Sequence, residues 1–234
     1  MTSSHYVPTH HPVLRAVASP VLVEEIESRT IQDYVDAMLD IGRKEPDMAG
    51  LAAPQIGIPL QIIIINSKSM QSQRPIPDGK NPSSFGVYIN PQILTFSGES
   101  ELDSEGCFSV PGLVGVVPRA KNVTVKARDL MGKEVLLELS GFSARVFQHE
   151  IDHINGILYP DVIFRHNPHS KGLHLLSHAY DPVEYQQKRF HDYREAIGTW
   201  RKEHGNIDNF SWGDTVGKIT WENEVSQSWP VWKK

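Results

Sequence analysis

The sequence has 234 residues, a length that fits one large domain, or a domain with an appendage, and can bury a sizeable core. Its formal net charge of −5 and the lack of a basic run exclude a nucleic-acid-binding arm. The longest strongly apolar run, Leu60–Ile65, is far below the roughly 20 residues that span a bilayer. Cys107 is the single cysteine, so no intramolecular disulfide can form, and Met1–His11 lacks the pattern of a secretory signal. We therefore expect an intracellular protein.

An amphipathic helix is predicted over Thr30–Arg43. Its apolar residues recur at helical spacing, namely Ile31, Tyr34, Val35, Met38 and Ile41. Thr30 and Asp33 fit a capping box at its start. The pattern indicates a surface helix that buries one stripe.

Strands are predicted where short segments rich in β-branched residues lie between turn-forming clusters. These segments are Leu60–Ile65, Tyr88–Ile93, Val123–Ala127 and Val135–Leu139. Gly132 fits a tight connection between the last two, which favours an antiparallel hairpin. The polar stretch Ser67–Gly86 predicts a loop.

A second helix is predicted over Gly141–Asn155, with Gly156 suited to the left-handed position after its end. Apolar residues occupy almost every side of it: Phe142, Val146, Phe147, Ile151 and Ile154. Charged and imidazole groups inside such a buried helix need partners.

The composition changes after Phe164. All five tryptophans lie in the last part of the chain, and Pro182–His204 predicts a further helix. We expect residues 1–164 to form a catalytic domain and residues 165–234 to form a Trp-rich extension. The extension is expected to pack on the core, on a second copy or on a partner.

The sharpest motif lies in the second helix and reads His149-Glu150-Ile151-Asp152-His153. Two imidazoles four residues apart on a helix can bind one metal ion, and the adjacent Glu150 can reach a water on that ion. A catalytic site needs a third protein ligand. A metzincin-like site would place a histidine where this chain has Tyr159, and a thermolysin-like site would need Glu184, on a different predicted helix.

Two further segments carry residues with suitable chemistry. Glu105-Gly106-Cys107-Phe108-Ser109 contains the only thiol, which would be a strong metal ligand as a thiolate. A buried structural cysteine or a Cys–His nucleophile pair are alternatives. In Gly50-Leu51-Ala52-Ala53-Pro54-Gln55-Ile56-Gly57, small residues allow a close backbone approach, and Gln55 offers an amide donor.

These three segments, in this order, resemble the signature of peptide deformylases. The resemblance covers His11–Phe164 and includes the stretches His11–Arg15 and Val117–Ala120. It implies an α+β fold in which antiparallel sheets surround a central metal-binding helix that bears the HExxH motif. It also implies removal of the formyl group from the N-terminal formyl-methionine of new polypeptides. Ferrous iron is implied as the native metal, and zinc, nickel or cobalt suit the same ligands.

The resemblance also assigns roles residue by residue. Cys107, His149 and His153 would bind the metal, and Glu150 would act as general base and then as general acid. Gln55 and the backbone N–H of Phe108 would form the oxyanion hole. The residues expected around the substrate are Gly50, Ala49, Glu105 and Val146; Gly50 would align the peptide through its backbone, and Glu105 would orient its neighbours.

The sequence departs from the family pattern at several positions. Met48 stands where the family usually has glycine, Phe108 replaces a common leucine, and Leu113–Val116 is apolar where the family is often polar. The apolar Leu113–Val116 stretch bears on substrate preference, and Met48 bears on the approach to the site. Phe108 should be tolerated, because its backbone N–H is the group expected to act. The alternative functions are a zinc endopeptidase and an inactive relative that binds nascent chains or ribosomes.

The expected partner is a formyl-methionyl nascent peptide, with the ribosome as a further candidate and with no nucleic acid or membrane bound directly. The resemblance implies the cytoplasm if the source is bacterial. If the source is eukaryotic, it implies mitochondria or plastids, because formylated initiation occurs there. The sequence leaves the oligomeric state open.

Overall fold

The computed structural model describes residues 5–9, 11–45, 48–71, 84–111, 113–166 and 173–175. Its helices are α1 (Arg29–Lys44), α2 (Ser67–Met70), α3 (Gly141–Ile154) and α4 (Tyr159–His166), with short 3-10 turns η1 (Pro12–Arg15), η2 (Val23–Glu25) and η3 (Ala53–Ile56). Its strands are β1 (Gly50–Ala52), β2 (Ile62–Asn66), β3 (Phe85–Phe96), β4 (Ser100–Gly106), β5 (Leu113–Ala120), β6 (Asn122–Arg128), β7 (Glu134–Ser140) and β8 (Leu173–Leu175). None of the described helices is long and apolar enough to cross a membrane.

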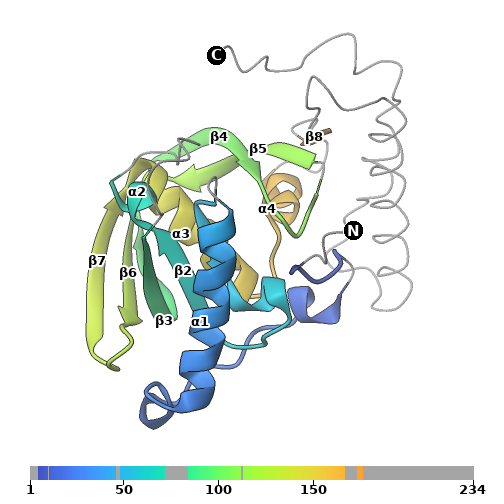
Figure 1. Cartoon of the computed structure of the whole chain (residues 1–234). Helices are drawn as coiled ribbons and strands as arrows, with labels where there is room; N and C mark the ends of the chain where they lie inside the picture. The colour runs from blue at the N-terminus through green and yellow to red at the C-terminus, as the bar shows by residue number, and fades with distance from the viewer. Residues whose placement is uncertain are drawn as a thin grey trace.

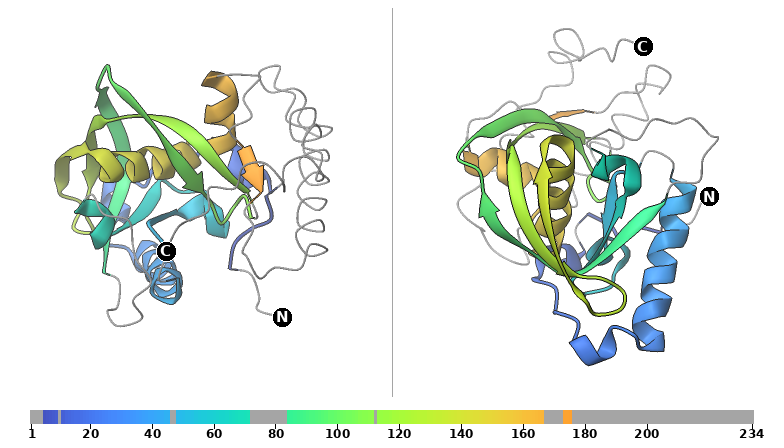
Figure 2. Two further views of the ribbon diagram at one scale, coloured as in Figure 1. Left: turned by 90° about the horizontal axis from the view of Figure 1, so that it is seen from above. Right: turned by 90° about the vertical axis from the view of Figure 1, so that its left-hand side faces the viewer.

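The strands form two antiparallel sheets. One is five-stranded with the order β1-β2-β3-β6-β7, and the other is three-stranded with the order β4-β5-β8. Helix α3 contacts strands of both sheets, including β1, β2 and β7 of the first and β5 of the second. The two views in Figure 2 show α3 running between the sheets. The expected α+β class is confirmed.

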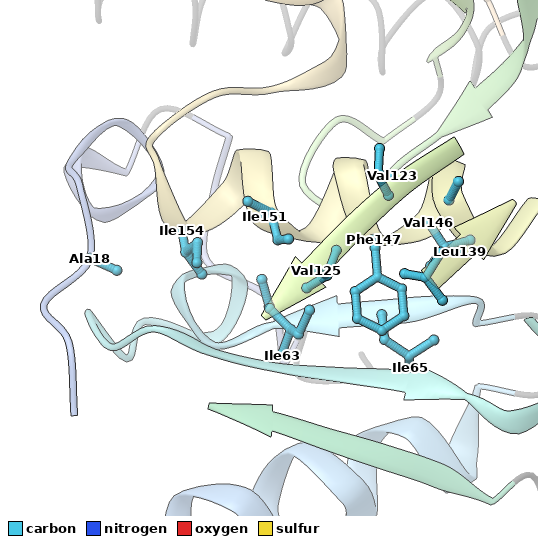
Figure 3. Packing of buried hydrophobic residues seen from close by; sticks show 12 residues of the cluster. Ala18, Ile63, Ile65, Val123, Val125, Leu139, Val146, Phe147, Ile151 and Ile154 are labelled. Atoms are coloured by element: carbon cyan, nitrogen blue, oxygen red, sulfur yellow. The ribbon is translucent and has the colours of Figure 1, made fainter. Parts of the chain in front are cut away.

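Strand β2 explains why two helices flank the first sheet. It is a run of isoleucines buried on both faces, and alternate side chains of a strand point to opposite sides. Ile62 and Ile64 pack with the buried stripe of α1, which consists of Ile31, Val35, Met38 and Ile41. Ile63 and Ile65 pack with Phe147 and Ile151 of α3, as Figure 3 shows. In Figure 1, α1 accordingly lies in front of this sheet and α3 behind it.

The long predicted elements are confirmed with small shifts at their ends. Helices α1 and α3 match the two predicted helices, and β2, β3, β6 and β7 match the four predicted strands. Strands β6 and β7 form the expected antiparallel hairpin, and Gly132 adopts a φ of 72° in its turn. Gly156 follows α3 with a φ of 73°, as predicted.

Two local predictions were wrong. The cap of α1 is Ser28, whose Oγ accepts a hydrogen bond from the Ile31 N–H, and not Thr30. The predicted loop Ser67–Gly86 begins with the helical turn α2, because Asn66 Oδ1 accepts from the Lys68 N–H and caps it. Phe85 and Gly86, at the end of the predicted loop, already belong to β3, and residues 72–83 of that loop lie outside the described residues.

Some elements lacked a sequence signal. Strand β1 is very short, and β4 (SELDSEG) is polar and mostly exposed, so neither has an apolar alternation. Strand β5 turns alternate residues inward, among them Val117 and Arg119. The predicted helix Pro182–His204 and the five tryptophans lie outside the described residues. The division at residue 164 therefore remains a prediction.

Candidate metal centre

Helix α3 carries the two histidines of the candidate centre on one side. The rings of His149 and His153 are 5.0 Å apart between centroids and cross at 78°. On another side of α3, Phe147, Ile151 and Ile154 are buried in the core against the five-stranded sheet (Figure 3). The packing of these apolar residues fixes the rotation of α3 and therefore the direction in which both imidazoles point.

Cys107 reaches the histidines from the end of β4. Its Sγ lies 3.2 Å from His153 Nε2. One ligand atom each from Cys107, His149 and His153 lies within 4.8 Å of the others, and this is the only such cluster among the residues that the structure describes. A thiolate and two imidazoles are ligands that suit zinc and ferrous iron. The donor set therefore fits one divalent transition-metal ion.

Glu105 orients His149 through the ring nitrogen that faces away from the cluster. Its Oε2 lies 2.8 Å from His149 Nδ1, which leaves Nε2 of the same ring to face the cluster. Burial by itself would raise the pKa of Glu105, but the Arg119 guanidinium and hydrogen bonds from His149 and Arg119 hold this pKa well below its usual range. A carboxylate on the second nitrogen is the usual way to set the tautomer of a metal-ligating histidine.

Two buried arginines hold Glu105 in turn. The Arg119 guanidinium makes a bidentate contact with Glu105, from Nε to Oε1 at 2.9 Å and from Nη2 to Oε2 at 3.0 Å. Its Nη1 donates to Asp152 Oδ2 on α3 at 2.5 Å. Arg145 of α3 donates to Glu105 Oε1 at 2.7 Å and to the Val117 carbonyl at 2.9 Å. This network joins β4, β5 and α3, which are the elements that bring the thiol and the imidazoles together.

Glu150 is a buried carboxyl group beside the cluster. Its side chain is enclosed, and its Oε2 has no hydrogen-bond partner in the described structure. Burial raises the pKa of Glu150 to about 7. Gly50 of β1 makes room for it, because a Cβ on Gly50 would lie 2.8 Å from Glu150 Oε1. An unpaired buried carboxyl next to a ligand cluster indicates a chemical rather than a structural role.

The side-chain amide of Gln55 has a defined orientation. Its Oε1 accepts from the Ala52 N–H at 2.8 Å, so Nε2 points the other way, 3.2 Å from Ser109 Oγ and 3.4 Å from Cys107 Sγ. The Ser109 N–H also points to the thiol, at 3.4 Å. Gln55 thus presents a donor at the cluster.

The other predicted site residues lie at different places around the cluster. Gly50 is next to Glu150, and Phe108 directly follows Cys107 with its ring partly exposed. Ala49 packs at the edge of the core cluster, and its carbonyl accepts from the Asn66 N–H. Val146 is buried within that core on α3.

The structure also accounts for one departure from the family pattern, Met48, and places one rejected ligand position, Tyr159. Met48 is buried under α1, in the cluster of Leu51 and Met38, so its side chain packs in that core. Tyr159 stacks beside the His149 ring, at 6.2 Å between centroids. Glu184, the thermolysin-like candidate, lies outside the described residues.

The sequence analysis gave no role to Arg119, Arg145 or Ser109, although Arg119 and Ser109 lie in segments that it singled out. Arg145 stands inside a helix that is apolar almost all round, and such a buried charge must be paired, so this signal could have been used. Ser109, two residues after the only cysteine, gave no comparable signal.

Comparison with known proteins identifies the fold and its chemistry. A family model described as polypeptide deformylase matches residues 4–168. The chain belongs to the peptide deformylase family. The peptide deformylase of Halothermothrix orenii is 41% identical over 154 residues, which cover 66% of this chain and 89% of that protein. The chloroplastic peptide deformylase 1A of Solanum lycopersicum is 39% identical over 155 residues, which cover 64% of this chain and 56% of that protein.

Solved structures agree with this assignment. A class I type b peptide deformylase from Acinetobacter baumannii, bound to Met-Ala-Ser, has a TM-score of 0.58 and 37% identity, covering 67% of this chain and 96% of that one. The plant peptide deformylase PDF1B has a TM-score of 0.61 and 27% identity, covering 88% and 95%. The chain is a metal-dependent hydrolase that removes the formyl group from N-terminal formyl-methionine during protein synthesis.

Proposed function

We propose that Cys107, His149 and His153 hold one divalent ion, ferrous iron in the native enzyme, and that Glu150 is the general base. The observation that carries this proposal is the convergence within 4.8 Å of the thiol that directly follows β4 and the two imidazoles of α3. The unpartnered Glu150 Oε2 supports it, because an isolated buried carboxylate is costly unless a positive charge or a donor compensates it. Zinc, nickel or cobalt suit the same donors, so the donor set supports a divalent ion, and iron is a separate proposal.

A bound divalent ion would supply a Lewis acid that polarises a carbonyl and makes a coordinated water more acidic. The chain itself would manage the protons. Glu150 would accept the proton of the attacking water at its carboxylate and then pass it to the amine nitrogen as the C–N bond to the formyl carbon breaks. The products are formate and a peptide with a free methionine amino group.

The remaining residues would bind and orient the substrate. Gln55 Nε2 and the Phe108 backbone N–H would donate hydrogen bonds to the oxygen on which negative charge develops. The Gly50 backbone would align the peptide, with Ala49 and Val146 beside it, while Glu105 would keep His149 oriented. Gln55 is suited to its role because Ala52 already fixes the direction of its amide.

We further propose that the substrate is the formyl-methionyl end of a nascent chain near the ribosome. The compartment would then be the one where formylated initiation occurs, in the bacterial cytoplasm or in an organelle. The chloroplastic name of the Solanum relative supports the organelle as one of these possibilities.

The test is turnover of formyl-Met-Ala-Ser by protein loaded anaerobically with iron. We expect release of formate and of intact Met-Ala-Ser. Cleavage of the internal peptide bonds would instead support a zinc endopeptidase. Binding of the peptide without turnover, by fully metal-loaded protein, would support an inactive relative.

A further inference from the structure

The N-terminal segment of residues 5–9 contacts both residues that carry the proposed oxyanion donors, at the ring of Phe108 and at the backbone carbonyl of Gln55. The ring of Tyr6 stacks on the ring of Phe108, with centroids 4.8 Å apart and planes at 4°. The next residue, Val7, donates its backbone N–H to the Gln55 carbonyl at 2.9 Å. Consecutive residues therefore contact Phe108 and Gln55, which come from distant parts of the sequence.

The segment is fitted to the turn that carries Gln55. Gly57 ends η3 with a φ of +87°, a conformation that favours glycine, and a Cβ there would lie 3.3 Å from Val7 Cγ1. Gly57 thus both closes the turn and leaves room for Val7. The contact between this segment and η3 therefore consists of a backbone hydrogen bond and of close packing at Gly57.

Tyr6 lies at the site and not merely near it. Burial raises the pKa of Tyr6, and the negative charges of Glu45, Cys107 and Glu150 add to the effect. Phe108 is 38% exposed even with Tyr6 on one face of its ring. Tyr6 therefore covers one face of a ring that is otherwise partly exposed.

We propose that Tyr6 is a positioning residue: by stacking on Phe108, it keeps the backbone N–H of residue 108 in place relative to Gln55, whose backbone carbonyl accepts a hydrogen bond from the neighbouring Val7. This inference rests on the proposed function. Oxyanion stabilisation depends on donors that are in place before charge develops, and small misplacements are expensive. Phe108 lies in the connection between β4 and β5, and the stack on Tyr6 would hold its backbone N–H in place.

The test compares Tyr6→Ala with Tyr6→Phe in the metal-loaded enzyme, using formyl-Met-Ala-Ser. We expect Tyr6→Ala to lower kcat about 10-fold with little change in KM or metal content, because the loss acts in the transition state. Tyr6→Phe keeps the stack and should retain kcat. Tyr34→Ala is the matched control, since Tyr34 is also a partly buried tyrosine packed against the same core cluster as Tyr6 but lies on α1, and it should keep kcat in folded protein.

A double-mutant cycle with Phe108→Leu tests whether Tyr6 affects kcat through its stack on Phe108. In the Phe108→Leu background, Tyr6→Ala should cost less than about twofold, because the partner ring is already gone. An equal loss in both backgrounds, or a loss in Tyr6→Phe as large as in Tyr6→Ala, would overturn the proposal. If Tyr6→Ala does not fold, Tyr6→Leu keeps apolar bulk without a flat ring and carries the same expectation.

The failure of this inference can be distinguished from failure of the proposed function. If Gln55→Ala loses kcat and Tyr6→Ala does not, only the role of Tyr6 is refuted. If Gln55→Ala and Glu150→Gln both keep full kcat, the proposed site itself is refuted.

Discussion

Gly50 and Glu150 are in such close contact that a Cβ on Gly50 would lie 2.8 Å from both Cγ and Oε1 of Glu150. The contact joins β1 to α3 across the site. The smallness of residue 50 therefore decides where the proposed general base can lie. A side chain at this position would have to displace the carboxyl group or the strand.

Gly50→Ala is expected to move the Glu150 carboxyl group while leaving the ligands in place. We expect kcat to fall by at least about 10²-fold, the lower end of a general-base contribution, with metal content retained. Gly98→Ala is the matched control, because a Cβ at Gly98 would meet nothing within 4 Å. Full activity in Gly50→Ala would show that the space beside Glu150 is not required.

Glu150→Gln tests the base directly. The amide keeps the shape of the side chain and removes the proton acceptor, so kcat should fall by about 10² to 10⁴-fold while the metal stays bound. Glu138→Gln, on an exposed position of β7, should change nothing. Unchanged turnover in Glu150→Gln would reject the assignment.

Gln55→Ala should remove one donor from the oxyanion hole. The expected loss is about 10² to 10³-fold in kcat, with KM little affected. Steady-state kinetics on formyl-Met-Ala-Ser separates the two parameters. A change confined to KM would instead assign Gln55 to binding of the ground state.

Metal binding should depend on Cys107. The wild-type chain is expected to bind about one equivalent of divalent ion, because one thiol and two imidazoles form a complete protein ligand set for a catalytic site. Cys107→Ser should bind much less metal in an otherwise folded protein, as elemental analysis and circular dichroism can show. Removing the metal from the wild type with a chelator should lower Tm, since the ion binds only the folded state. Full metal content in Cys107→Ser would contradict the ligand set.

Arg145→Met should destabilise the fold through the buried network. It leaves Glu105 with one fewer guanidinium partner and leaves the Val117 carbonyl without this donor. We expect a loss of about 3 kcal/mol in the free energy of unfolding, measured with denaturant. Arg43→Met breaks only an exposed pair with Asp40 and should cost less than about 0.5 kcal/mol. Equal effects of the two variants would show that burial adds nothing to the Glu105 network.

The sequence by itself determined the features that depend on neighbours in the chain. The spacing of His149 and His153 places both imidazoles on one side of a helix, since α-helical periodicity is local. The β-branched runs of β2, β6 and β7 were found for the same reason, and Gly132 marked their hairpin. The order of the three motifs was enough to indicate the family.

Only the tertiary structure decided which distant residues meet. Cys107 lies 3.2 Å from His153 because β4 pairs with β5 in one register, and both are held to α3 by Arg119 and Arg145. Strand β4 is polar and exposed, so no hydrophobic pattern could reveal its register. The stack of Tyr6 on Phe108 likewise joins segments whose distance in space is set by the whole core and by no local preference. A sequence states which side chains exist, whereas contacts between remote segments are fixed only when the apolar faces of α1, α3 and the sheets are buried together.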